Sequence, residues 1–332
     1  MSDTIIELRG LTKRFEKTLD LAGRTLKKLG LPIKQEVVHA VDGVDLAIRK
    51  GEVVGLVGES GCGKSTLGRM VAGIMTPSEG EMFWRGANTK TLSEAAGREA
   101  KLRTQMIFQD PYASLNPRMK VEQIVGEAPL YHGMTNRAEW AGYVDAQMRR
   151  AGLDPAFKSR YPHQFSGGQR QRIGIARALA VQPEFIVCDE AVAALDVSIQ
   201  AQILNLFMEL RRDLDLTYLF ISHDLGVVEH LSDRVVIMYL GRVVEQAPSE
   251  EIFARANHPY TQSLLSAVPR IEARRRAFNV VHGEIPSPLN PPKGCHFHPR
   301  CPHAMARCKV ERPALREIAP GHFSACHLND AA

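Results

Sequence analysis

Long apolar runs are missing from this sequence. None of its uninterrupted hydrophobic stretches approaches the roughly 20 residues that a membrane-spanning helix needs. The start, MSDTIIELRG, lacks the basic and apolar regions of a signal peptide. A strong charge excess is also missing, because 42 basic and 37 acidic residues leave a net charge of only +5, too little to indicate nucleic-acid binding. We therefore expect a cytosolic chain that reaches a membrane only through partners.

The composition is that of an ordinary globular protein. With 332 residues, of which 44% are hydrophobic and 24% charged, the chain can form one large α/β domain with an appendage. Residues 234–239 and 242–247, joined across Leu240-Gly241, predict a hairpin, and the pattern from 110 to 177 is mainly helical. Short apolar or alternating runs predict buried strands at 44–48, 52–57, 185–188 and 218–221.

A phosphate-binding loop is predicted between an apolar strand and a helix. GESGCGKST (58–66) fits the pattern G-x-x-x-x-G-K-[ST], in which glycines let successive N–H groups surround phosphate oxygens. Lys64 is expected to reach the β- and γ-phosphates, and the Ser65 hydroxyl to bind Mg²⁺. The predicted nucleotide-binding residues of this loop are Gly58, Glu59, Ser60, Gly61, Cys62, Gly63, Lys64, Ser65 and Thr66.

Cys62 occupies a variable position of this loop. Its place near a helix N-terminus favours the thiolate. We therefore predict that a thiol reagent inactivates the protein and that Mg-ATP protects it.

A second strand delivers two carboxylates. FIVCDE (185–190) is an apolar strand that ends in Asp189 and Glu190. Buried carboxylates need a nearby cation, so Asp189 is predicted to hold Mg²⁺. Glu190 is then placed to polarise the attacking water as a general base.

The segment FSGGQRQRIGIARALA (165–180) resembles the signature of the ABC ATPase family, with Phe165 in place of leucine. The resemblance implies a RecA-like P-loop NTPase core with an antiparallel β subdomain and an inserted helical signature subdomain. In this family the signature covers the γ-phosphate bound by the opposite subunit, so ATP joins two subunits. The matching residues are Ser166, Gly167, Gly168 and Gln169.

Other matches follow the order of the same family. They imply that Gln109 is the Q-loop glutamine near Mg²⁺ or water, Asp196 the D-loop residue, and His223 the switch histidine at the γ-phosphate. Phe15 is expected to stack on adenine. One departure is DEAVAALD (189–196), which lacks the serine usual before ALD.

The C-terminal part resembles the same region of oligopeptide/dipeptide importer ATPases, through HPYTQSLLSAVP (258–269) and GEIPSPLNPPKGCHFHPRCP (283–302). This implies a second ATPase subunit, identical or paralogous, two transmembrane permeases and an extracytoplasmic binding protein. The chain itself would sit at the cytoplasmic face of the inner membrane. Peptides are the expected cargo, with nickel, glutathione, opines or oligosaccharides as alternatives. We place the ATPase domain at 1–256, with its helical subdomain at about 111–178, and the Cys-rich extension at 257–332.

Four cysteines gather in this extension, without the paired spacing of a zinc ribbon. In a reducing compartment they predict a metal site, a 4Fe–4S cluster as in relatives or else zinc with histidines as substitutes. Reduced thiols in a tail are the remaining alternative. The residues are Cys295, Cys301, Cys308 and Cys326, with His296, His298, His303, His322 and His327.

Other functional classes fit the sequence less well. A soluble ABC ATPase of translation or DNA repair usually has two ATPase units or a coiled-coil insertion. A non-hydrolytic module would lack Lys64 or Glu190, and both are present. A phosphotransferase would have no need of the SGGQ motif.

Overall fold

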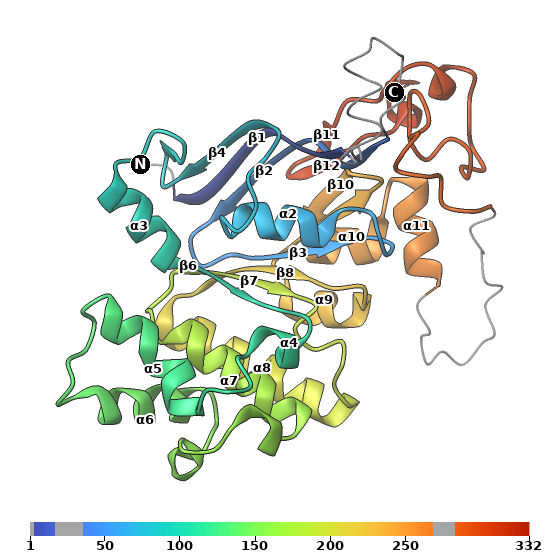
Figure 1. The fold of residues 1–332 in the computed structure, drawn as a ribbon. Helices are drawn as coiled ribbons and strands as arrows, with labels where there is room; N and C mark the ends of the chain where they lie inside the picture. The colour runs from blue at the N-terminus through green and yellow to red at the C-terminus, as the bar shows by residue number, and fades with distance from the viewer. Residues whose placement is uncertain (1–2, 17–35, 268–282, 332) are drawn as a thin grey trace, which may run out of the picture.

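The computed structural model describes residues 3–16, 36–267 and 283–331. Two sheets, a helix between them and a lobe of helices make up this part of the chain (Figure 1). Within the described ranges, no helix is both long and apolar enough to cross a membrane.

The smaller sheet is antiparallel and has four strands. The alternation predicted for residues 44–48 is confirmed, because Val44, Leu46 and Ile48 face the core. One face of this sheet is therefore apolar and packs on the rest of the domain. In spatial order, its strands are β2 (Val37–Arg49), β1 (Thr4–Glu16), β4 (Glu79–Trp84) and β5 (Ala87–Asn88).

The larger sheet has eight strands, and its central part is parallel. The predicted strands at 52–57, 185–188 and 218–221 are confirmed as its fully buried members β3, β7 and β8. In spatial order, the strands are β11 (Arg316–Ala319), β12 (His322–Ser324), β10 (Arg242–Pro248), β9 (Arg234–Tyr239), β3 (Val53–Val57), β8 (Thr217–Ile221), β7 (Phe185–Asp189) and β6 (Thr104–Ile107).

The predicted hairpin is confirmed by β9 and β10, which pair antiparallel across Leu240 and Gly241. Both turn residues have positive φ, 40° and 81°, as a tight hairpin turn requires. The Asp42 N–H donates to the Gly241 carbonyl at 2.9 Å, so the turn is fastened to the smaller sheet.

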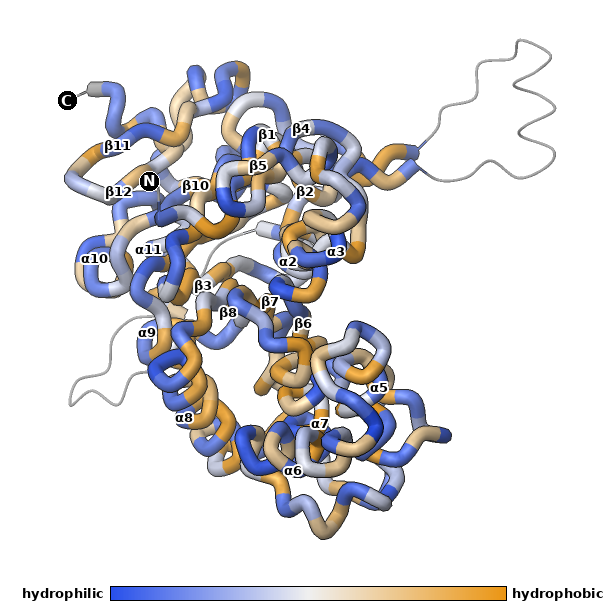
Figure 2. The backbone as a smooth tube through the Cα atoms, turned by 90° about the vertical axis from the view of Figure 1, so that its left-hand side faces the viewer, coloured by the Kyte–Doolittle hydropathy of each residue, from blue (hydrophilic) through white to orange (hydrophobic). Residues whose placement is uncertain are grey.

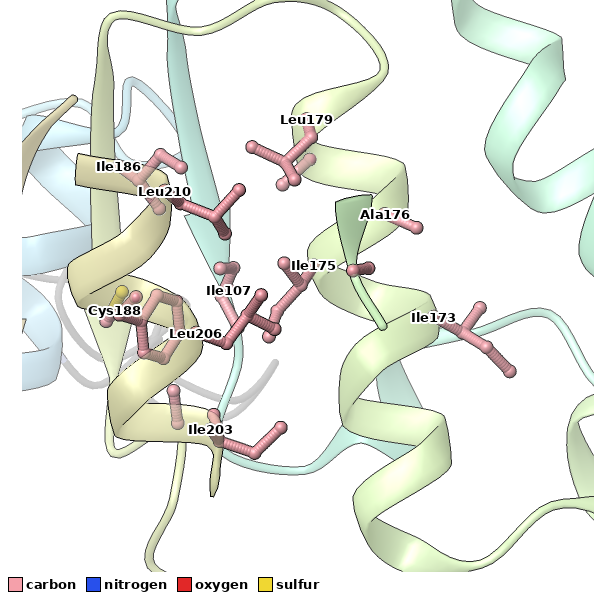
Figure 3. Packing of buried hydrophobic residues seen from close by; sticks show 14 of the residues in the cluster. Ile107, Ile173, Ile175, Ala176, Leu179, Ile186, Cys188, Ile203, Leu206 and Leu210 are labelled. Carbon is pink, nitrogen blue, oxygen red and sulfur yellow. The ribbon is translucent and has the colours of Figure 1, made fainter. Parts of the chain in front are cut away.

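Helix α2 (Lys64–Val71) fills the space between the two sheets, and its buried face joins their common core. Helices α7 (Gly167–Leu179) and α8 (Val197–Leu214) cover the opposite face of the larger sheet. Figure 3 shows Ile175, Leu206 and Ile107 of these elements packed together. The larger sheet therefore separates α2 from α7.

A helical lobe (111–179) extends from this covered face. Figures 1 and 2 both place it at the opposite end of the molecule from the smaller sheet. The remaining helices of the ATPase part are α3 (Glu94–Arg103) and α9 (Leu225–Leu231). Besides α7, the helices of the lobe are α4 (Pro111–Ser114), α5 (Val121–Tyr131) and α6 (Trp140–Arg150), with 3-10 turns at Pro155–Phe157 and Pro162–Gln164.

The C-terminal segment joins the larger sheet instead of forming a separate core. Strand β12 pairs with β10, and Tyr260 and Phe297 are buried in one cluster with Tyr239 of β9. The predicted α/β class, with antiparallel subdomain, helical insertion and small extension, is thus confirmed. The helices of this segment are α10 (Ser249–Arg255) and α11 (Pro259–Ser266), with 3-10 turns at Arg307–Lys309 and His327–Ala331.

Candidate functional site

The loop 58–63 leaves β3 and leads directly into α2, as the sequence predicts. Gly61 and Gly63 have φ values of 79° and 106°, in the region that favours glycine. Gly63 is the N-cap of α2 and brings no side chain that accepts from the first N–H groups of the helix. These groups are therefore available to an anion, which the helix dipole also favours.

Two glycines of the loop are enclosed by neighbouring backbone. A Cβ on Gly58 would lie 2.1 Å from the Met238 carbonyl oxygen, and one on Gly63 2.1 Å from the Ala40 carbonyl oxygen. The Gly241 N–H also donates to the Cys62 carbonyl at 2.9 Å. Strand β2 and the β9–β10 turn thus fix the loop from outside, and only glycine fits at these two positions.

Lys64 folds back over the loop that it follows. Its buried ammonium donates to the carbonyls of Gly58 at 2.7 Å and Glu59 at 3.1 Å. A phosphate held by the loop N–H groups would meet this positive charge. The loop and its lysine together make an anion-binding site.

Two of the predicted Mg²⁺ ligands lie together. The Ser65 hydroxyl donates to Asp189 Oδ1 at 2.7 Å, which links the start of α2 to the end of β7. Burial raises the pKa of the Asp189 carboxyl, and the Ser65 hydrogen bond and nearby Arg69 oppose this rise. A hydroxyl and a carboxylate are oxygen ligands that suit Mg²⁺, so this pair fits the cation. Gln109, the third predicted ligand, donates from its amide nitrogen to Glu190, and its role as a Mg²⁺ ligand through the amide oxygen stays a prediction.

Glu190 is the centre of a second group. Gln109 Nε2 donates to its carboxylate at 2.8 Å, and His223 Nδ1 lies 3.4 Å from the same Oε2 oxygen. Gln109, Glu190 and His223 follow β6, β7 and β8, whose carboxyl ends meet at one edge of the sheet. The structure thus brings together three residues predicted for hydrolysis.

The backbone of Glu190 is strained. Its φ of 48° lies in the left-handed region, which costs a non-glycine residue about 1–2 kcal/mol. The Glu190 N–H donates to the Ile221 carbonyl at 3.0 Å, and this bond to the end of β8 holds the conformation. The carboxylate is thereby aimed between Gln109 and His223.

The SGGQ segment begins α7, as the sequence predicts. Ser166 is the N-cap, with its Oγ accepting from the Gln169 N–H at 3.4 Å, while Gln169 Oε1 accepts from the Ser166 N–H at 3.0 Å. Ser166 and Gly167 are exposed. Phe165, where the family has leucine, is buried and packs edge-on against Phe157 at 6.3 Å. Phe165 therefore belongs to the core of this part of the chain.

The start of α8 packs against this signature. A Cβ on Gly168 would lie 2.5 Å from Ile199 Cγ2, and one on Gly167 would contact Leu195 at 3.7 Å. Asp196 is the exposed N-cap of α8. The predicted signature and D-loop thus belong to one exposed surface, on the other side of the larger sheet from α2 (Figure 1).

Phe15 lies near the end of β1, opposite Val38 of β2. Its ring is partly exposed and lies 5.3 Å from the Lys13 ammonium. Ala40, two residues along β2, bounds Gly63 of the phosphate loop. The ring therefore lies along the strand that borders the loop, and its role in stacking on a base stays a prediction.

The expectation of a thiolate at Cys62 is wrong. The side chain is buried, and burial raises the pKa of its thiol more than nearby Lys64 lowers it. A favourable helix terminus does not compensate for the lost hydration of the charged form.

The predicted metal site in the extension is not supported. Among the described residues, no group of three or more His, Cys, Asp or Glu side chains is arranged to hold a metal ion. Burial raises the pKa of the Cys326 thiol to about 11, and its neighbours Cys295, Cys301 and Cys308 add to the rise.

Four of the five proposed substitute histidines have other partners. His296 Nδ1 is hydrogen-bonded to the Leu240 carbonyl, and His298 Nδ1 to the Cys295 carbonyl. His322 Nε2 lies 2.7 Å from the buried Glu245 carboxylate, and both ring nitrogens of His327 have partners. These contacts involve ring nitrogens that the zinc alternative would need.

Two residues at the phosphate loop were not predicted. The Tyr260 hydroxyl accepts from the Glu59 N–H at 2.9 Å, and the Arg300 guanidinium pairs with the Glu59 carboxylate. They come from 201 and 241 positions further along the chain, so no local pattern places them there.

Comparison with known families agrees with this geometry. Residues 41–193 match the ABC transporter family, and residues 244–308 match the family described as oligopeptide/dipeptide transporter, C-terminal region. The chain is 50% identical over 330 residues to the oligopeptide transport ATP-binding protein AppF of Bacillus subtilis, covering 98% of both chains. It is 48% identical over 328 residues to a putative peptide import ATP-binding protein of Brucella ovis, again covering 98% of both.

Solved structures share the fold. The chain resembles cbiO1 of Clostridium perfringens, described as part of an ABC transporter complex, with a TM-score of 0.62 and 28% identity over 76% of this chain and 92% of that one. It also resembles the ATP-binding cassette MJ0796 in a dimeric post-hydrolysis state with ADP and Pi, with a TM-score of 0.62 and 27% identity over 74% and 99% of the two chains.

Proposed function

Because this chain belongs to the family of oligopeptide transport ATP-binding proteins of ABC transporters, we propose that it hydrolyses ATP in a nucleotide-sandwich dimer and couples this reaction to peptide uptake. Peptides are the proposed cargo because relatives that match nearly the whole chain are named for peptide transport.

The phosphate loop binds the triphosphate. Its N–H groups and the Lys64 ammonium receive the phosphate oxygens, and Phe15 stacks on the adenine. Ser65 and Asp189 would hold Mg²⁺, with Gln109 as the third proposed ligand, and the cation would neutralise negative charge on the triphosphate. The contact of 2.7 Å between Ser65 and Asp189 supports the assignment of these two ligands.

Hydrolysis is carried by the group around Glu190. Its carboxylate orients the attacking water and accepts a proton from it. Gln109 fixes one side of the carboxylate through its amide nitrogen at 2.8 Å. His223, whose side chain is 59% exposed, is free to turn toward the γ-phosphate of bound ATP.

The position of the signature is the observation that supports a dimer. Ser166 and Gly167 are exposed at the start of α7, while α2 lies on the other side of the larger sheet. An exposed helix start suits the γ-phosphate held by another subunit, because its first N–H groups and the helix dipole favour an anion. The second subunit is either the same chain or a paralogue, and the dimeric structure of MJ0796 supports this arrangement for a similar chain.

The other partners follow from the family. Two transmembrane permeases bind the dimer at the cytoplasmic face of the inner membrane, and an extracytoplasmic binding protein delivers the peptide. The segment after Gln109 is suited to contact the permeases, since Tyr112 is 52% exposed there. Movement of Gln109 on hydrolysis would then reach the permeases directly.

Steady-state ATPase measurements on Glu190→Gln test the assigned base. The variant should bind Mg-ATP normally, because Glu190 has no contact with the phosphate loop in the described structure. Its hydrolysis rate should fall by about 10²–10⁴, the usual contribution of a general base. Turnover at the wild-type rate would refute the role of Glu190.

A further inference from the structure

The second residue of the phosphate loop is held from two sides by the C-terminal extension. The Glu59 N–H donates to the Tyr260 hydroxyl at 2.9 Å. Its carboxylate accepts two bonds from Arg300, Nη1 to Oε2 at 2.7 Å and Nη2 to Oε1 at 2.9 Å. This two-point pairing fixes both the position and the orientation of the carboxylate.

Packing holds Tyr260 and Arg300 in place. Tyr260 is fully buried in α11, and its ring centroid lies 4.6 Å from Tyr239 and 5.4 Å from Phe297. The Arg300 guanidinium lies 5.8 Å from the Tyr239 ring and 5.9 Å from the Phe297 ring, and only 5% of its side chain is exposed. The extension therefore presents a fixed hydroxyl and a fixed positive charge to the loop.

The contacts converge where the triphosphate would bind. The Glu59 carbonyl is also an acceptor for the Lys64 ammonium, at 3.1 Å. An unpaired Glu59 carboxylate beside this site would repel the phosphates, and the repulsion would be strong because only 23% of its side chain is exposed. Arg300 cancels this charge, while Tyr260 fixes the backbone just before the N–H groups that surround the phosphates.

We propose that Arg300 and Tyr260 are positioning residues that hold Glu59, so that the affinity of the phosphate loop for Mg-ATP depends on the C-terminal extension. The proposal rests on nucleotide binding at this loop, as proposed above. It makes the extension part of the nucleotide site and not only an appendage of the ATPase domain.

Isothermal titration of the full chain with Mg-ATP tests the role of the charge. Arg300→Gln leaves Glu59 uncompensated, and its Kd for Mg-ATP should rise about tenfold, as expected for losing a charged hydrogen-bond pair. In the double variant Glu59→Gln/Arg300→Gln the repelling carboxylate is gone as well. Most of the lost affinity should therefore return, which a purely structural role of Arg300 would not produce.

Arg234→Gln is the matched control. Arg234 pairs with Glu52 through two bonds at 2.7 and 3.2 Å, and both side chains are largely buried, at 20% and 12% exposure. This pair lies at the other end of β3 from the loop, so its loss should lower the unfolding midpoint and leave the Kd for Mg-ATP unchanged.

Tyr260→Phe tests the second contact without disturbing the aromatic cluster. It removes only the hydroxyl that accepts from Glu59, and the Kd should rise about threefold to tenfold. This variant also tests the positioning role if Arg300→Gln does not fold.

The outcomes separate the two proposals. Wild-type affinity in Arg300→Gln or in Tyr260→Phe, or a double variant as weak as Arg300→Gln alone, overturns the positioning role. If the wild-type chain itself fails to bind Mg-ATP, the proposed function is overturned instead.

Discussion

Two buried histidines should make the stability of this protein depend on pH. Burial lowers the pKa of His258 from 6.5 to about 4, and burial, helped by Arg242, does the same for His296. His258 Nδ1 accepts from the Tyr260 N–H at 3.1 Å, so it caps α11 as a neutral ring. In the unfolded chain both imidazoles regain their ordinary pKa.

The sign and size of the effect follow from proton linkage. The pKa of each histidine is lower in the folded chain than in the unfolded chain. Their contribution to stability is therefore fully present above pH 6.5 and is lost as the pH falls toward 4. At about pH 5.5 each histidine lowers the free energy of unfolding by about 1.4 kcal/mol relative to neutral pH. The pair together lowers it by about 3 kcal/mol.

Urea unfolding at about pH 7.5 and 5.5, followed by circular dichroism, measures this loss. His258→Asn keeps an oxygen that caps the helix and should remove about half of the pH dependence. His132→Asn changes an exposed histidine and is the control. Comparison with wild type at each pH cancels other groups, such as Asp189, whose raised pKa acts in the opposite direction. An equal loss in wild type and His258→Asn would refute this reasoning.

Two further predictions concern the nucleotide site. Cys62, with its buried thiol and raised pKa, should react with a thiol reagent far more slowly than a free thiol, as mass spectrometry of the labelled chain would measure. Rapid labelling that Mg-ATP prevents would contradict the burial. Phe15→Ala should weaken Mg-ATP binding by about 1 kcal/mol, or about fivefold in Kd, because a stacking ring is lost. Unchanged affinity in a calorimetric titration would exclude stacking at Phe15.

The sequence predicted those parts of the fold and site that depend on local pattern. Strand β3, the glycine loop and α2 follow one another along the chain, so the spacing of Gly58, Gly63 and Lys64 was enough to place them. The roles of Asp189 and Glu190 were predictable for a similar reason. Carboxylates at the end of a buried apolar strand need a nearby cation, which a nucleotide site supplies. The signature was found through its resemblance to a known family.

The parts that escaped prediction depend on distant contacts or on burial. The left-handed backbone of Glu190 is set by its bond to Ile221 on the neighbouring strand, which no local pattern encodes. Arg300 and Tyr260 reach Glu59 only because the extension folds back onto the larger sheet. At Cys62, the helix N-terminus is visible in the sequence, but the burial whose desolvation outweighs its effect on the thiol is not.

The composite nucleotide site is tested most directly by the mass of the Glu190→Gln chain in solution with Mg-ATP. Light scattering should give the 36.8 kDa of one chain without nucleotide and about twice that mass with Mg-ATP, because the uncleaved nucleotide holds two subunits together. Ser166→Arg, which changes only the exposed signature, should prevent this increase. The measurement is made on the chain alone and on any complex with a second ATP-binding subunit that co-purifies with it. A Glu190→Gln chain that binds Mg-ATP tightly but keeps the mass of one chain, with no such subunit attached, would contradict the account.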